Sequence, residues 1–513
     1  MFFQSLTRFK RFVDSVDRES ILKALSLSAV CLGVLLRLLS YAHDRGLWND
    51  EIELTRNIEE RSYVGLLKPL SYDQTAPIGF LFLERLAIQL LGDNEYSLRL
   101  LPLLAGLLSL LLFFRFARLY LRPSAALVAI FLFSVAGKLV YYSAEAKQYS
   151  GDVAVALMLM LFSIKLWCER VTVRQFVTFG MLGATAIWFS HPAVFILAGV
   201  GTILILRNVL RKHWTNAAGF SIVALMWAAS FIGCYVVSLR PSLRSEFLLD
   251  YWSSQQAFMP FVIGSVSEAF WFVRAFGQIF QNATGFTLPV MAAIIFLTGC
   301  WSAFVRRDRF LFLLLSPIPF ALAASALHKY PFIDRLLLFA APSIIVFVSI
   351  GIGHLFSKAR LAGVAIVFAL LLGPTVNAIH TAIRQDSRED IKLLLSHIRE
   401  HWQPGDKIYV FYSALQEYWY YAEKYGFTES SYVRGKRAKE AREITADIDS
   451  LKYHGRVWAI FLIYTERHEA ERAMLLGHLN DSGLRLDEFE TGGLFVYLYD
   501  MGAAPSSSEQ SKA

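Results

Sequence analysis

The first residues that could do chemistry are carboxylates close to the N-terminal end of the chain. They lie within residues 44–73 and are Asp44, Asp50, Glu51, Glu53, Glu59, Glu60 and Asp73. Asp50 and Glu51 follow Trp48 and stand a short distance beyond a long apolar run. A carboxylate held at a membrane face could act as the general base for an acceptor hydroxyl group. A solvated acidic loop is the simpler alternative.

A second group lies in YYSAEAKQYSGD, residues 141–152, between two apolar runs. It combines Lys147 with Tyr142, Glu145, Tyr149 and Asp152. Tyrosines that anchor the membrane interface, with a lysine that extends to water, would give the same pattern. A cation in such a turn could also bind an anionic headgroup.

A third group lies in HKYPFIDRLLLFAAP, residues 328–342, where Lys329 and Arg335 precede an apolar helix. Lys and Arg usually concentrate on the cytoplasmic side of a membrane, so cations on the outer side are unusual. Their presence there suggests an anionic partner such as a lipid phosphate. Arg37 and His191 stand near the outer ends of other apolar runs. For these two, a snorkelling arginine and a structural histidine are the simpler interpretations.

The composition shows what must position these groups. Of 513 residues, 55% are hydrophobic and only 18% are charged, with a mean hydropathy of +0.44. Soluble domains carry about 25% charged residues, so the chain is predicted to be a membrane protein with many spans. The composition also excludes a disordered chain and a disulfide scaffold. The cysteines, Cys31, Cys168, Cys234 and Cys300, show no metal-ligand spacing and are predicted to be apolar fillers.

Eleven apolar runs have about the length of a membrane span. They cover residues 21–41, 97–114, 124–142, 151–168, 176–190, 192–206, 217–238, 287–305, 310–327, 336–356 and 361–383. The segment 78–92 carries Glu84 and Arg85 in its middle and is better explained as an interfacial helix.

Basic clusters predict the orientation in the membrane, because short cytoplasmic loops are rich in Lys and Arg. They are Arg115, Arg118 and Arg122; Lys165, Arg170 and Arg174; Arg207, Arg211 and Lys212; Arg306, Arg307 and Arg309; and Lys358 and Arg360. With eleven spans and a basic N-terminus in the cytoplasm, every cluster is cytoplasmic. The loops 43–96 and 239–286 and the chain after residue 384 are then outside.

The hydrophilic end of the chain differs from the rest. Residues 1–383 have a net charge of +12 and residues 384–513 a net charge of −4, so the basic excess belongs to the membrane part and does not indicate nucleic-acid binding. After residue 384 the sequence predicts strands at 407–413, 456–464 and 494–500 and helices at 414–426 and 441–455, following a first amphipathic helix. This alternation indicates a small α/β domain. We expect an all-α polytopic membrane domain at 1–383, an extracytoplasmic α/β domain at 384–502 and a disordered tail at 503–513.

The order of these motifs resembles the GT-C superfamily of polyprenyl-phosphate-sugar glycosyltransferases. The similar branch includes the lipid A aminoarabinose transferase, rhizobial galacturonosyltransferases and relatives of protein O-mannosyltransferases. The resemblance rests on Asp50-Glu51 after the first helix, TAPIGFLFLERLAIQLLGDNEYSLRLLPLLAGLL at 75–108, YYSAEAKQYS and IDRLLLFAAP. Lys147 stands where the family commonly has Arg, and Leu336 where Tyr is common.

The resemblance implies a GT-C fold and an inverting sugar transfer at the outer face of a bacterial inner membrane. The acceptor would be a hydroxyl group of an envelope lipid, glycan or protein. The family positions make Asp50 the catalytic base and give Glu51 a role in orientation. The residues implied to bind the donor phosphate are Lys147, Arg335, Arg99 and Lys329. Those implied to line the pocket are Arg37, Tyr142, Glu145, Tyr149 and His191. No metal or other cofactor is expected, because basic side chains can stabilise the leaving phosphate.

Other functions remain open at this stage. An O-antigen ligase or polymerase also uses lipid-linked sugars, although its catalytic loop would lie late in the chain. A transporter would place charged or helix-breaking residues at mid-membrane in two related halves, and the sequence shows neither. A non-catalytic envelope assembly protein would leave Asp50 and Glu51 replaceable. The sugar and the acceptor are not specified by the sequence.

Overall fold

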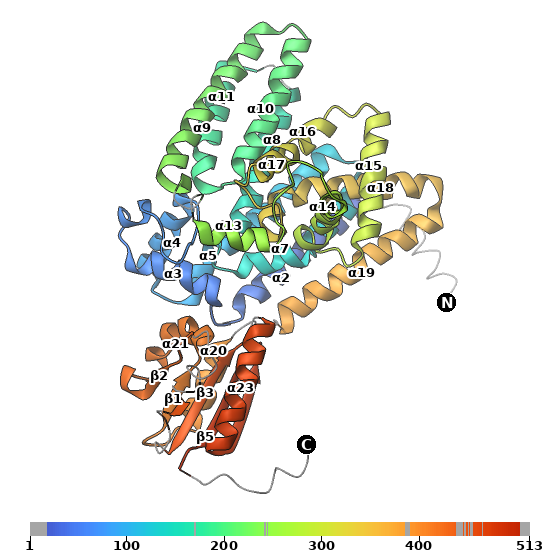
Figure 1. Ribbon diagram of the computed structural model, residues 1–513. Coiled ribbons are helices and arrows are strands. Elements are labelled where there is room, and N and C mark those ends of the chain that lie inside the picture. The colour runs from blue at the N-terminus through green and yellow to red at the C-terminus, as the bar shows by residue number, and fades with distance from the viewer. Residues whose placement is uncertain are drawn as a thin grey trace, which may run out of the picture. The chain divides into compact units, whose positions relative to one another are not determined.

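Figure 1 shows the computed structural model of the protein, which forms two compact units. The structure describes residues 18–502 except 169–170, 241–242, 244, 385–389, 438–444, 446–447, 450, 452–454 and 464. The first unit comprises residues 1–43 and 57–385, and the second comprises residues 44–56 and 386–513. The basic N-terminal residues and the tail at 503–513 lie outside the described residues. The predicted domain limits at 383 and 502 remain a proposal.

The first unit is built from helices. Its longer described helices are α2 (Arg18–Ala42), α4 (Ile78–Leu91), α5 (Glu95–Tyr120), α6 (Pro123–Ser134), α8 (Tyr149–Cys168), α9 (Val173–Phe189), α10 (Ala193–Leu210), α11 (Trp214–Cys234), α14 (Val266–Gln278), α15 (Pro289–Val305), α17 (Pro317–Ala326), α18 (Ala341–Lys358) and α19 (Arg360–Arg384). Its shorter elements are α7 (Gly137–Tyr141), α13 (Glu246–Ser254), α16 (Leu311–Leu315) and the 3-10 helices η1 (Gly65–Leu67), η2 (Tyr142–Ala144) and η5 (Asp334–Ala340), with two π-helical turns, η3 (Tyr235–Leu239) and η4 (Ile279–Ala283). Helix α3 (Asn49–Glu60) begins in the second unit and ends in the first.

Seven of the described helical segments are long and apolar enough to cross a bilayer. They are Glu19–Ala42, Glu95–Tyr120, Tyr149–Trp167, Ala193–Leu210, Trp214–Leu239, Asp334–Lys358 and Gly363–Ile383. An eighth is counted if α6 and the segment Gly137–Ala144, which meet at a bend of 52°, form one span. The polytopic membrane fold is therefore confirmed. The remaining predicted runs form the shorter α9, α15 and α16–α17, so the count of eleven spans stays a prediction.

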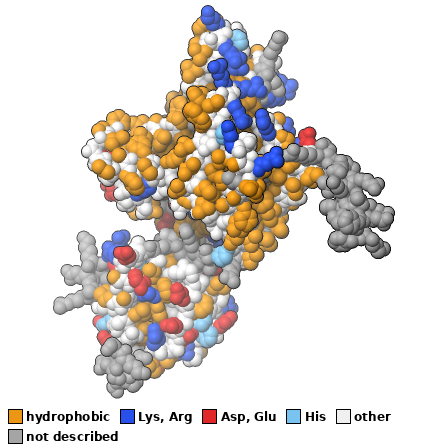
Figure 2. All heavy atoms as spheres, turned by 90° about the vertical axis from the view of Figure 1, so that its right-hand side faces the viewer, with side chains coloured by type: hydrophobic (Ala, Val, Ile, Leu, Met, Phe, Trp, Pro, Cys, Tyr) orange, Lys and Arg blue, Asp and Glu red, His pale blue; other side chains and the backbone are white. Residues whose placement is uncertain are grey.

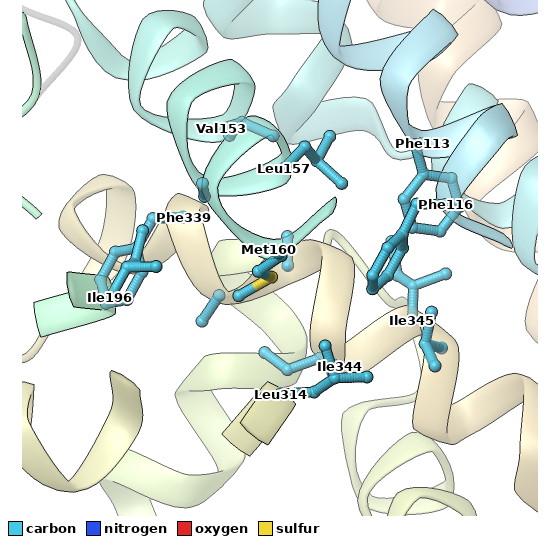
Figure 3. Close-up of a cluster of buried hydrophobic side chains, with 14 of the residues drawn as sticks. Phe113, Phe116, Val153, Leu157, Met160, Ile196, Leu314, Phe339, Ile344 and Ile345 are labelled. Atoms are coloured by element: carbon cyan, nitrogen blue, oxygen red, sulfur yellow. The ribbon is translucent and has the colours of Figure 1, made fainter. Parts of the chain in front are cut away.

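The core of the first unit forms around α8 and α18. The side chains of Figure 3 come from α5 (Phe113, Phe116), α8 (Val153, Leu157, Met160), α10 (Ile196), α16 (Leu314), η5 (Phe339) and α18 (Ile344, Ile345). Nearly every residue from Ala341 to Ile352 is buried, as expected of a helix that is apolar on all sides and enclosed by other helices. On the visible face of this unit, hydrophobic side chains cover much of the surface and Lys and Arg gather along one side (Figure 2).

Helices α15 and α18 touch backbone to backbone through glycines. A Cβ atom added at Gly299 would lie 1.9 Å from the carbonyl oxygen of Phe347, and one added at Gly351 would lie 2.1 Å from that of Ile295. Small residues allow such close crossings in membrane helices. The α15–α18 pair therefore depends on the absence of a side chain at these positions.

Replacing Gly299 by Ala is expected to destabilise the first unit by about 1–3 kcal/mol, because two helix backbones would have to separate. The midpoint of thermal unfolding in detergent should fall. Gly353→Ala, also in a helix of this pair, is the control, since nothing lies within 4 Å of its Cβ position. Equal midpoints for the two variants would contradict the close crossing.

The second unit contains a five-stranded sheet in the order β2-β1-β3-β5-β4. Its described elements are α20 (Ile391–Glu400), β1 (Lys407–Val410), α21 (Leu415–Tyr421), β2 (Tyr432–Arg434), β3 (Arg456–Leu462), α23 (Glu466–Ser482), β4 (Leu484–Thr491) and β5 (Leu494–Asp500), with the 3-10 turns η6 (Tyr412–Ala414), η7 (Glu423–Tyr425) and η8 (Glu429–Ser431). Strands β2, β1 and β3 run parallel, and β5 and β4 pair antiparallel. The predicted α/β domain is therefore confirmed. Most of the helix predicted at 441–455 lies outside the described residues.

Candidate active site

The carboxylates Asp50 and Glu51 lie in the first turn of α3. Glu51 is fully buried, and the backbone N–H of Trp48 donates to its Oε2 at 3.4 Å. Glu51 thus accepts from the backbone N–H of the residue that precedes α3, which is one of the two contacts of a capping box. Asp50 is half-buried. The two side chains therefore differ: Glu51 holds the start of the helix, and Asp50 is the more accessible carboxylate.

The segment that carries Asp50 is held by the rest of the second unit. The Lys392 Nζ lies 2.8 Å from Asp44 Oδ2, and the backbone N–H of Leu47 donates to the Tyr421 hydroxyl at 2.8 Å. Arg56 donates to Oε1 of Gln416 at 3.0 Å. The sequence treated 43–96 as one loop of the membrane domain. In the structure, its first part packs with α20 and α21 instead.

In the first unit, the turn formed by η2 and the start of α8 carries Tyr142, Glu145, Lys147 and Tyr149, all of them buried. The rings of Tyr142 and Tyr149 meet edge to face with centroids 5.2 Å apart. Their burial argues against tyrosines and a lysine that merely sit at the membrane surface. The sequence stretch 141–152 thus forms a folded polar turn inside the unit.

Lys147 is only 4% exposed, and its Nζ donates to Oε1 of Gln74 at 2.8 Å. Gln74 belongs to the connection that precedes α4, and it also lines a small surface hollow with Leu66, Lys68 and Val237. Nothing in the sequence singled out Gln74 for this group. Its contact places the lysine charge next to the connection that precedes α4.

Arg335, in η5, lies next to the same turn although it is distant from it in the sequence. Its guanidinium carbon lies 5.5 Å from the centre of the Tyr149 ring. Both Arg335 and Glu145 are close enough to Tyr142 to act on its hydroxyl electrostatically. The structure therefore brings Arg335 of the third group next to Tyr142 and Tyr149 of the second group.

Further polar side chains adjoin this cluster. Tyr330 lies close to both Tyr149 and Asp152, and its hydroxyl donates to the carbonyl of Leu336 at 2.7 Å. Burial, with the nearby Asp152 charge, raises the pKa of Tyr330 well above its usual value, so that its hydroxyl stays protonated. The Ser190 hydroxyl lies beside the buried Asp152 carboxylate. Asp152 belongs to the second group seen in the sequence, whereas Tyr330 and Ser190 join it only through the fold.

His191 follows Ser190 in the connection between α9 and α10. Its Nε2 atom is buried and has no hydrogen-bond partner among the described residues. Burial lowers the pKa of His191 to about 4, so the ring is neutral at pH 7. A neutral histidine here can donate or accept a hydrogen bond, but it does not supply a positive charge.

The other predicted residues have different surroundings. Arg37 is buried in α2, where Nη1 donates to the carbonyls of Gly33 at 3.0 Å and Ser134 at 3.3 Å. It therefore ties α2 to α6. Arg99 is buried in the second turn of α5, whereas Lys329 is exposed before η5. Their phosphate roles stay a prediction.

Glu84 in α4 is a buried carboxyl group that the sequence analysis used only to argue against a span. It is 1% exposed, and neither oxygen has a hydrogen-bond partner among the described residues. Burial raises the pKa of Glu84 well above its usual range. Helix α4 is not among the candidate spans of the described chain.

Two cations of the first unit could take part in chemistry: the buried Lys147 and the partly exposed Arg335 beside Tyr149. Lys147 and Arg335 could bind an anion by charge-assisted hydrogen bonds, and a water-poor surrounding would strengthen them. In the second unit, the half-buried Asp50 at a helix start offers a carboxylate that could accept a proton.

Comparison with known proteins bears on the fold. Residues 75–233 match the family of dolichyl-phosphate-mannose-protein mannosyltransferases. ArnT from Cupriavidus metallidurans in the apo state is similar, with a TM-score of 0.53 and 13% identity over 94% of this chain and 98% of ArnT. The same ArnT bound to undecaprenyl phosphate gives a TM-score of 0.52 and 15% identity over 92% and 97%.

The archaeal oligosaccharyltransferase AglB from Archaeoglobus fulgidus, in complex with an inhibitory peptide and a dolichol-phosphate, is also similar. Its TM-score is 0.52, with 13% identity over 96% of this chain and 75% of AglB. No curated protein matches the chain in sequence. The chain therefore has the GT-C fold, and its resemblance to the polyprenyl-phosphate-sugar glycosyltransferases of that superfamily is confirmed.

Proposed function

We propose that this protein transfers a sugar from a polyprenyl-phosphate donor to a hydroxyl group of an envelope lipid, glycan or protein, with inversion at the anomeric carbon. The observation that carries the proposal is the polar turn at 142–149, which holds the buried Lys147 and whose Tyr149 ring is approached by the partly exposed Arg335. Solved structures of the same fold hold undecaprenyl phosphate or dolichol-phosphate, which supports a lipid phosphate as the anion.

In the proposed reaction, Asp50 accepts the proton of the acceptor hydroxyl as its oxygen attacks the anomeric carbon. The bond between that carbon and the phosphate oxygen breaks, and the polyprenyl phosphate leaves with the bonding electron pair. Lys147 and Arg335 stabilise its growing negative charge, with Arg99 and Lys329 as further candidates. Glu51 holds α3 so that Asp50 keeps its orientation. Tyr142, Tyr149 and Glu145 fix the positions of the cations.

We further propose that the N-terminus is cytoplasmic and that residues 384–513 are extracytoplasmic, in a bacterial inner membrane. The basic loops carry this orientation, because Lys and Arg concentrate on the cytoplasmic side. A reporter enzyme that is active only outside the cytoplasm, fused after residue 385, should be active. A reporter at this position that is active only in the cytoplasm would overturn the orientation.

The transfer itself is tested by mass spectrometry of envelope lipids and glycans from a strain that lacks the protein. One class of envelope molecule should lose a single sugar, and the matching polyprenyl-phosphate sugar should accumulate. The wild-type gene should restore the product, whereas the Asp50→Asn gene should not. An unchanged envelope would contradict a transferase. Loss of the sugar with full rescue by Asp50→Asn would favour a non-catalytic assembly role.

A further inference from the structure

The second unit contains a cluster of metal-ligand side chains that the proposed transfer does not use. His397 lies in the last turn of α20, and His401 caps that helix four residues later. Asp487 projects from β4, the edge strand of the sheet. One ligand atom from each of the three side chains lies within 4.8 Å of the other two. Residues four apart share a helix face, so the pair is presented to Asp487 from one side.

Neighbouring groups fix the two imidazole rings. The His397 ring stacks on Phe489 with centroids 4.7 Å apart, and its Nε2 lies 2.7 Å from Asp487 Oδ2. The His401 Nδ1 lies 2.9 Å from the carbonyl oxygen of His397. If Nδ1 donates there, the lone pair of His401 Nε2 is available for a ligand. Metal-binding histidines in proteins commonly donate their second ring N–H to a backbone carbonyl in this way.

The backbone of β4 is irregular where it supplies the carboxylate. Its pairing with β5 shifts register between Arg485 and Asp487, which leaves Leu486 as an extra residue. Such bulges redirect a side chain relative to a regular strand. The nearby cation Arg456 is held by Asp406, whose Oδ1 lies 3.2 Å from its Nε. Its positive charge is therefore offset close by.

We propose that His397, His401 and Asp487 bind a zinc ion, or a similar transition-metal ion, that links α20 to the edge of the sheet. Two imidazoles and a carboxylate are a common ligand set for Zn²⁺, whereas Mg²⁺ and Ca²⁺ prefer oxygen ligands alone. Tetrahedral zinc with bonds of about 2.0–2.2 Å places its ligand atoms about 3.4 Å apart. On binding, His397 and Asp487 would therefore separate slightly from 2.7 Å, the exposed His401 ring would turn toward them, and a water molecule would fill the fourth position.

The test uses the full-length protein in detergent, freed of any affinity tag and treated with a chelator. The protein is dialysed against ZnCl₂ over a range of free concentrations, and bound zinc is measured by mass spectrometry. The wild type should bind about one zinc ion. His401→Ala and Asp487→Asn should each lower the affinity for that ion by at least about 100-fold, because loss of a hydrogen-bond partner of a ligand alone lowers metal affinity by 10- to 100-fold. ZnCl₂, but not MgCl₂, should raise the midpoint of thermal unfolding of the wild type.

The matched control is His478→Ala. His478 forms a similar pair with Asp449 at 2.7 Å, but no third ligand joins it among the described residues. This variant should keep wild-type zinc affinity. Unfolding midpoints without zinc verify that each variant is folded. Zinc affinity in both His401→Ala and Asp487→Asn equal to that of the wild type would overturn the proposal, as would a wild type that binds no zinc.

Discussion

Asp50→Asn is expected to reduce sugar transfer by about 10²- to 10⁴-fold, the usual contribution of a general base. Asn has nearly the same size but cannot accept the proton of the acceptor hydroxyl. Asp50 is half-buried at the start of α3, so the substitution leaves the core unchanged. Transfer is measured with purified protein in lipid vesicles that contain the polyprenyl-phosphate donor identified from the deletion strain.

Glu51→Gln is the matched comparison, because it makes the same chemical change at the next residue. Glu51 is fully buried and accepts from the backbone of Trp48, which a glutamine oxygen can also do. Its transfer rate should fall less than that of Asp50→Asn. If Glu51→Gln abolished transfer while Asp50→Asn remained active, the two roles would be reversed. Full activity in both variants would place the catalytic base elsewhere.

Arg335→Ala and Lys147→Ala are each expected to weaken binding of the polyprenyl phosphate by roughly 10- to 100-fold. A hydrogen bond to a charged group contributes about 1.5–3 kcal/mol. Binding can be measured by titration of a fluorescent polyprenyl phosphate into the detergent-solubilised protein. Affinity for the acceptor should change much less. Lys147→Arg should retain donor binding, because it keeps the positive charge.

Lys138→Ala is a suitable control for these two variants. Lys138 lies in α7, a few residues before the same turn, and has no assigned role. This variant separates a specific phosphate contact from a general loss of positive charge. Unchanged donor affinity in folded Lys147→Ala and Arg335→Ala would refute the assignment of both cations.

The sheet illustrates which elements a single sequence reveals. Strands β1, β3 and β5 are predictable because they are continuous apolar runs with almost every residue buried. Strand β4, LRLDEFET, was missed because it lies at the edge and leaves most of its charged side chains in solvent. Edge strands often carry charges, which hide the strand pattern. The zinc ligand Asp487 lies on this missed strand.

The sequence alone determined that the chain is a polytopic membrane protein, showed its resemblance to the GT-C superfamily and singled out the turn at 141–152. A span is recognised from one apolar run and its orientation from the Lys and Arg residues beside it, so both can be inferred from short stretches of sequence. Only the tertiary structure joined Lys147 to Gln74, Arg335 to Tyr149, and the Asp50 segment to α20 and α21. These partners are separated by tens to hundreds of residues. Hydrophobic periodicity records that a side chain is buried, but which partner it meets depends on how the helices pack.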